Sequence, residues 1–72
     1  MMQYRVLAKA VVRAEADLAS ARVGVVEPGE LLVIARREGG RVQRREGGWV
    51  SEAAADGTPL AEFEEEMPAG QL

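Results

Sequence analysis

Residues 31–50 read LLVIARREGGRVQRREGGWV, and this stretch decides the fold. The pentapeptide Arg36–Gly40 recurs as Arg44–Gly48, so that each copy places two arginines before a Glu-Gly-Gly turn signal. Only Arg41–Gln43 lies between the copies, which is enough for one short strand. Trp49–Ser51 follows the second copy. The spacing therefore predicts a three-stranded antiparallel meander with two tight turns.

Apolar segments on the N-terminal side of the meander add further strands. The first strand of the meander, Leu31–Arg37, opens with consecutive apolar residues, a run typical of a strand buried on both faces. Upstream, the alternation at Tyr4–Ala8 predicts a strand, and Ala10–Arg13 and Val23–Val26 are further short extended segments. The Pro-Gly pair within Glu27–Glu30 has the residue types of a type II turn.

The remaining segments complete a small all-β fold. Ala14–Arg22 has no clear apolar stripe and is interpreted as a structured loop. Glu52–Gly57 is a brief connection with a helical turn, and Thr58–Phe63 is a last strand. Pro59 is compatible with an edge strand or with a place among the first residues of the strand. We expect five or six short antiparallel strands closed into a barrel over residues 1–63, because closure removes exposed edges. Residues 64–72, which begin with three glutamates, are interpreted as an acidic, flexible tail.

The composition limits the possible functions. A chain of 72 residues allows one domain. It contains no cysteine and no histidine, which excludes disulfides, thiolate nucleophiles and imidazole bases. The acidic residues Glu62 and Glu64–Glu66 lack the spacing of an ordered cation-binding loop. We therefore expect no enzymatic activity, no cofactor and no metal site.

Two further absences concern the compartment. No apolar run approaches the roughly 20 residues that span a bilayer, so we expect no membrane partner. The N-terminus, Met1–Arg5, lacks the basic and then apolar layout of a signal peptide. Together with the absence of cysteine, this favours the cytoplasm.

Several short motifs resemble the bacterial-type SH3 domain. In chain order they are Val12-Arg13, Ser20, Val23–Val26, Gly29–Val33 and Gly48–Val50. Their order and spacing are similar to that family over a little more than half of the chain. The resemblance implies an SH3-like barrel with a short 3₁₀ turn before the last strand. It also implies a binding role, because relatives of this type target cell-wall peptides or serve as accessory modules of larger proteins.

The aromatic groove of eukaryotic SH3 domains is not expected here. Those domains hold proline-rich peptides between aromatic side chains. This chain has one tryptophan, one tyrosine and one phenylalanine, and Arg41-Val42 stands where that family has tandem tryptophans. Recognition must therefore use other residue types.

The charges suggest which residue types these are. Residues 1–45 hold nine basic and five acidic side chains, whereas residues 46–72 hold seven acidic and no basic ones. Guanidinium groups form charge-assisted hydrogen bonds to carboxylates. We expect a protein- or peptide-binding module whose contact surface combines the loop Ala14–Arg22 with the repeat arginines and Trp49. The predicted partner-binding residues are Arg36, Arg37, Arg41, Arg44, Trp49 and Tyr4.

Other interpretations stay open. The same arginines are able to bind RNA phosphates, although Glu38 and Glu46 lie beside them and no second aromatic residue is available for base stacking. The basic and acidic segments also allow a homo-oligomer, with strand exchange at the edge that contains Pro59. Finally, Trp49 and Tyr4 either anchor a partner or pack into the barrel or along its rim.

Overall fold

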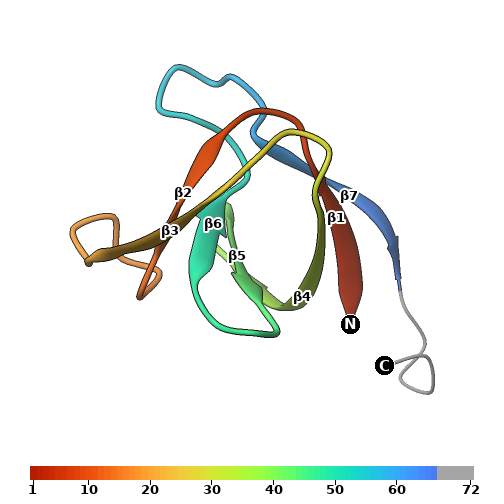
Figure 1. Ribbon diagram of the computed structural model, residues 1–72, viewed down its shortest axis with the longest axis horizontal. Helices are drawn as coiled ribbons and strands as arrows, with labels where there is room; N and C mark the ends of the chain where they lie inside the picture. The colour runs from red at the N-terminus through yellow and green to blue at the C-terminus, as the bar shows by residue number, and fades with distance from the viewer. Residues whose placement is uncertain (67–72) are drawn as a thin grey trace.

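The computed structural model describes residues 1–66, which contain seven β-strands and no helix. The strands are β1 (Met2–Val6), β2 (Ala10–Arg13), β3 (Arg22–Val26), β4 (Leu31–Glu38), β5 (Arg41–Arg44), β6 (Trp49–Ser51) and β7 (Ala61–Glu66). They form one antiparallel sheet in the order β3-β2-β6-β5-β4-β1-β7 (Figure 1). The prediction of a small all-β fold is confirmed, with seven strands in place of five or six.

The predicted meander is present as β4, β5 and β6. β5 pairs with β4 on one side and with β6 on the other. The first tight turn consists of Gly39 and Gly40, which have φ angles of 55° and 80°. A two-residue hairpin turn with positive φ at both positions matches the right-handed twist of its strands, and glycine adopts it without steric cost.

The turn Glu27–Glu30 forms as predicted, but the strands on either side of it do not pair with each other. Glu30 N–H donates to the Glu27 carbonyl at 3.2 Å. β3 lies at one edge beside β2, whereas β4 lies between β5 and β1. The turn also meets the end of β1, because Val6 N–H donates to the Glu30 carbonyl at 2.9 Å and Gly29 N–H to the Val6 carbonyl at 2.8 Å. These bonds curl the sheet around its core (Figure 1).

Alternate residues of the strands fill a single core inside the curl. The buried cluster comprises Tyr4, Val6, Ala10, Val12, Val26, Leu32, Ile34, Val42, Val50 and Ala61. The expectation that the apolar run of β4 is buried on both faces is wrong: Leu32 is buried, whereas Leu31 is 54% exposed. A single curled sheet encloses only its inner face, so side chains of the outer face meet solvent.

The last strand differs from its predicted range. β7 starts at Ala61 and continues through Glu64–Glu66, which were expected to lie in the tail. Pairing with β1 extends it, with Gln3 opposite Glu65 and Met2 opposite Glu66. The connection before it closes one turn from Gly57 N–H to the Ala54 carbonyl at 2.9 Å, a bond that spans three residues as in a 3₁₀ turn. The rest of the expected tail, residues 67–72, lies outside the described residues.

Candidate functional site

A β-bulge divides the predicted arginine cluster between the two faces of the sheet. The register of β4 and β5 shifts between Ile34 and Arg36. Ile34 points into the core, and without the bulge Arg36 would point the same way. The extra residue reverses this, so that Arg36 lies opposite Gln43 and Arg37 lies opposite the buried Val42. Neighbouring arginines of the repeat therefore serve different surfaces.

Three of the four predicted arginines are paired with acidic residues of the same chain. Arg36 pairs with Glu38 at 3.0 Å and Arg44 with Glu46 at 3.1 Å. Each of these pairs is formed within one half of the repeat, by its own arginine and glutamate. The third pair joins Arg37 to Glu52. These contacts divide the expected cationic patch into neutral pairs.

Trp49 packs against the outer face of the sheet and is only 6% exposed. Its neighbour Val50 points into the core, so the two side chains occupy opposite faces of β6. In the registers of β2, β6, β5 and β4, Trp49 lies opposite Arg13 and Gln43, and Gln43 lies opposite Arg36. The Arg36 guanidinium covers the indole at 5.6 Å from the ring centroid. The indole is therefore covered by the protein itself, and its predicted role as a partner contact is not supported by its position.

Tyr4 is buried in the core at 2% exposure, which also removes its ring from the surface. Its hydroxyl donates a hydrogen bond to Glu52 Oε2 at 2.8 Å, and Arg37 Nε donates to Glu52 Oε1 at 2.9 Å. Burial, and then the hydrogen bond and the charge of Glu52, raise the pKa of Tyr4 to about 12. Tyr4, Arg37 and Glu52 thus form a structural network between β1, β4 and the end of β6.

Arg41 is the predicted arginine that remains available. Glu38 lies directly opposite it in the register, but the Glu38 carboxylate is taken by Arg36. Within residues 1–66 no carboxylate pairs with Arg41, and its Nε is buried without a hydrogen-bond acceptor. A buried donor without a partner costs about 1–3 kcal/mol. Because this Nε is buried, an acceptor from outside reaches it only when the side chain turns toward the groove.

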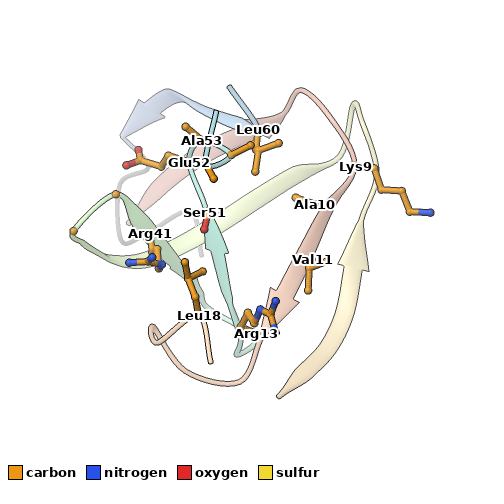
Figure 2. A pocket seen from close by; sticks show the side chains of 14 residues that line it. Lys9, Ala10, Val11, Arg13, Leu18, Arg41, Ser51, Glu52, Ala53 and Leu60 are labelled. Carbon is orange, nitrogen blue, oxygen red and sulfur yellow. The ribbon is translucent and has the colours of Figure 1, made fainter. Parts of the chain in front are cut away.

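Arg41 lines a groove of about 670 Å³ on the outer face, over β2, β5 and β6. The size lies in the range of ligand-binding clefts. Figure 2 shows Arg41, Leu18, Arg13 and Val11 around the groove, with Ser51 between them. The remaining lining residues are Lys9, Ala10, Gly39, Gly40, Glu52, Ala53, Ala54, Ala55 and Leu60. The lining thus combines two guanidinium groups with apolar side chains.

The charge of the groove is unbalanced. Its cations are Lys9, Arg13 and Arg41, and its one acidic lining residue is Glu52. Lys9 projects away from the groove in Figure 2, and Glu52 is engaged by two hydrogen bonds from the network above. Arg13 Nη1 donates to the Ser20 carbonyl at 3.0 Å, which fixes the guanidinium beside the loop. The groove therefore presents positive charge beside an apolar wall.

The sequence interpretation identified part of this site. It included Arg41 and, within the loop Ala14–Arg22, Leu18, which is 52% exposed. It did not include Val11, Ser51 or Leu60. A leucine alone in an otherwise polar and alanine-rich loop was the available signal for an apolar contact. Val11 and Ser51 come together through the pairing of β2 with β6, and Leu60 is placed by the hydrogen bond from its N–H to the Glu52 carbonyl at 2.8 Å.

Other types of site have less support in this structure. Among residues 1–66, no three acidic side chains gather in a way that would hold a metal ion. No helix in the described part of the chain has the length and hydrophobicity needed to cross a membrane. No family model, curated protein or solved structure matches the sequence or the fold. The function must therefore be inferred from the groove itself.

Proposed function

We propose that this chain is a non-catalytic binding module that recognises an acidic segment of a partner protein in the groove that contains Arg41. The guanidinium of Arg41, which lines the groove and has no carboxylate partner within residues 1–66, is the observation that carries this proposal. A carboxylate bound side-on to a guanidinium accepts two hydrogen bonds, one of them from Nε. Such a ligand supplies the carboxylate partner that Arg41 lacks within residues 1–66, and a turn of the side chain toward the groove brings its buried Nε into reach.

The groove wall supports a peptide rather than a free ion. Leu18, Val11 and Leu60 supply apolar surface within the same groove as Arg41. An extended peptide with alternating acidic and apolar side chains matches both features, because the acidic groups reach the arginines while the apolar groups cover the wall. The resemblance to bacterial-type SH3 domains points in the same direction, toward an accessory interaction domain of a larger protein.

RNA binding is the less favoured alternative. Binding of phosphates through the repeat arginines would have to break the pairs that Arg36, Arg37 and Arg44 make with glutamates. No aromatic face is free for base stacking beside them, because Trp49 is covered. The surface therefore suits a carboxylate better than a nucleic-acid backbone.

A phage-displayed library of random short peptides tests the proposal. Selection on the wild-type chain should enrich peptides that combine Asp or Glu with apolar residues. Arg41→Gln should weaken a selected peptide about tenfold or more, since a charged hydrogen-bonded pair contributes about 1.5–3 kcal/mol. Arg45→Gln is the matched control, because Arg45 is an exposed arginine outside the groove. The Arg45→Gln variant should bind the selected peptide with the wild-type affinity.

Three results would contradict the proposal. The first is that no peptide is enriched, and the second is that the enriched peptides lack acidic residues. The third is that Arg41→Gln binds the enriched peptides as tightly as the wild type does. Titration with polyuridylic acid checks the alternative. RNA affinity that falls steeply with salt, and that is lost when Arg36, Arg37 and Arg44 are neutralised together, would favour a nucleic-acid interface in place of the proposed groove.

A further inference from the structure

β3 is an edge strand that leaves one side of its backbone without a partner strand. It pairs with β2 only and stands at the end of the sheet (Figure 1). Val26 is its single buried residue, whereas Val23 is 57% and Val25 is 49% exposed. Val25 lies opposite Val11, so the exposed valines extend the apolar wall of the groove toward the edge of the sheet. A row of free backbone groups beside exposed valines is a template for strand pairing.

The two edges of the sheet differ in their protection. β7, at the other end, carries glutamates at four of its six positions, and like charges there oppose pairing with a second copy of the same strand. β3 has no proline, and its one charged residue, Arg22, and its register shift against β2 both lie before Gly24. A homo-oligomer, which the sequence allows, is therefore expected to form through β3 and not through the edge that follows Pro59.

We propose that two copies of this chain associate by antiparallel pairing of β3 with β3, around a two-fold axis at Gly24. This register places Val23 of each copy opposite Val25 of the other, which brings four half-exposed valines together on one face. A two-fold axis perpendicular to the sheet keeps the outer faces of the two copies on the same side. The pairing therefore buries apolar surface and satisfies free backbone groups at the same time.

Charge complementarity favours this arrangement. Arg22 lies at the start of β3, and the turn that follows the strand carries Glu27 and Glu30. Antiparallel pairing sets Arg22 of each copy beside the acidic turn of the other. Neither Arg22 nor Glu27 forms an ion pair within residues 1–66. Both ends of the interface thus bring opposite charges together, and no like charges face each other across β3.

Gly24 is suited to the centre of such an interface. Its φ is not in the left-handed region, so a turn conformation does not explain the glycine. A glycine inside a strand often marks a β-bulge, and the register of β3 with β2 shifts directly before Gly24; it also often marks a place where another backbone approaches closely. A Cβ built at this position would meet only Val12 Cβ, at the ordinary contact distance of 3.9 Å. The position therefore tolerates a small side chain.

Cysteine cross-linking tests the register, because the natural chain contains no cysteine. Residues directly opposite in an antiparallel pair have Cα atoms about 4.5–5.5 Å apart, within the range that a disulfide bridges. Oxidised Gly24→Cys should therefore give a covalent dimer. The two Cα atoms of Val23→Cys would be about 8 Å apart, too far for a bridge. Leu31→Cys, at an exposed site on β4 away from the proposed interface, measures cross-linking by random collision.

Sedimentation equilibrium of the chain without cysteine provides the second readout. The mass should rise with concentration toward that of a dimer, and Val25→Lys should keep it monomeric, because lysine blocks edge pairing. Leu31→Lys should leave the association unchanged, and circular dichroism should show the same strand content in every variant. The proposal is overturned if the chain is a monomer at all concentrations, or if Leu31→Lys weakens the association as much as Val25→Lys does. It is also overturned if Gly24→Cys and Val23→Cys cross-link to the same extent.

Discussion

The hydroxyl of Tyr4 in β1 donates a 2.8 Å hydrogen bond to Glu52, the residue that follows β6. Glu52 in turn accepts a hydrogen bond from Arg37 near the end of β4. Three strands that are not all neighbours in the sheet are thereby joined through one carboxylate. The carboxylate thus adds side-chain links between strands that the backbone ladder already connects through β5.

Tyr4 should make the stability of the fold depend on pH above about 10. The pKa of Tyr4 is about 12 in the folded chain, against a reference of 10.0. Below pH 10 both states are protonated and the stabilisation is complete. Above it the unfolded chain loses the proton first, so the free energy of unfolding falls as the pH rises toward 12. Urea unfolding of the wild type and of Tyr4→Phe across this range measures the difference.

The same prediction has a direct optical readout. The chain contains one tyrosine, so phenolate absorbance reports Tyr4 alone. The midpoint should lie near 12 in the folded protein and near 10 in denaturant. Below pH 10, Tyr4→Phe should be less stable than the wild type by about 1.5–3 kcal/mol, the typical contribution of a hydrogen bond to a charged group. A folded midpoint near 10 would mean that Tyr4 is neither buried nor bonded in solution.

Removal of the Arg36 guanidinium should expose the indole of Trp49. The guanidinium lies 5.6 Å from the ring centroid, and the ring is otherwise covered by the sheet. Arg36→Gln should increase acrylamide quenching of the single tryptophan and destabilise the fold by about 0.5–1 kcal/mol, the value for an exposed cation–π contact. Arg45→Gln should change neither quantity. Quenching equal to that of the wild type would show that Arg36 does not cover Trp49 in solution.

Two neighbouring glycines should respond differently to alanine. Gly47 and Gly48 have φ angles of 106° and 88°, so either substitution strains the backbone by about 1 kcal/mol. A Cβ at Gly47 would meet nothing within 4 Å, whereas a Cβ at Gly48 would collide with Val12 Cγ1. Gly48→Ala should therefore be less stable than Gly47→Ala by about a further 1–3 kcal/mol in urea unfolding. Equal losses would show that Val12 moves away freely.

The repeat made the meander predictable because its turn chemistry is local. Two Glu-Gly-Gly signals fix where the chain reverses, and the segment Arg41–Gln43 between them has little choice but to pair with both neighbours. The outward position of Arg36 could not be predicted in the same way. It depends on a bulge after Ile34, and bulges have no dependable residue signature in a single sequence.

The candidate groove was less predictable than the fold. Val11 and Ser51 are distant in sequence, and they line one groove because β2 pairs with β6. The availability of Arg41 depends on which arginine Glu38 selects, and composition does not decide this. The glutamates after Phe63 were assigned to a tail because charge runs are usually solvated, but they continue the strand that pairs with β1, and the Glu64 carboxylate pairs with Arg5 at 3.0 Å.

The first two residues of β4 test whether only the inner face of the sheet is buried. Leu31 and Leu32 are chemically identical neighbours, but Leu31 is 54% exposed on the outer face and Leu32 is 4% exposed in the core. Leu32→Ala should reduce the free energy of unfolding by about 2–5 kcal/mol, because it leaves a cavity. Leu31→Ala should change it by about 0.5 kcal/mol or less. Urea unfolding of both variants decides the point, since similar losses would mean that β4 is covered on both faces in solution.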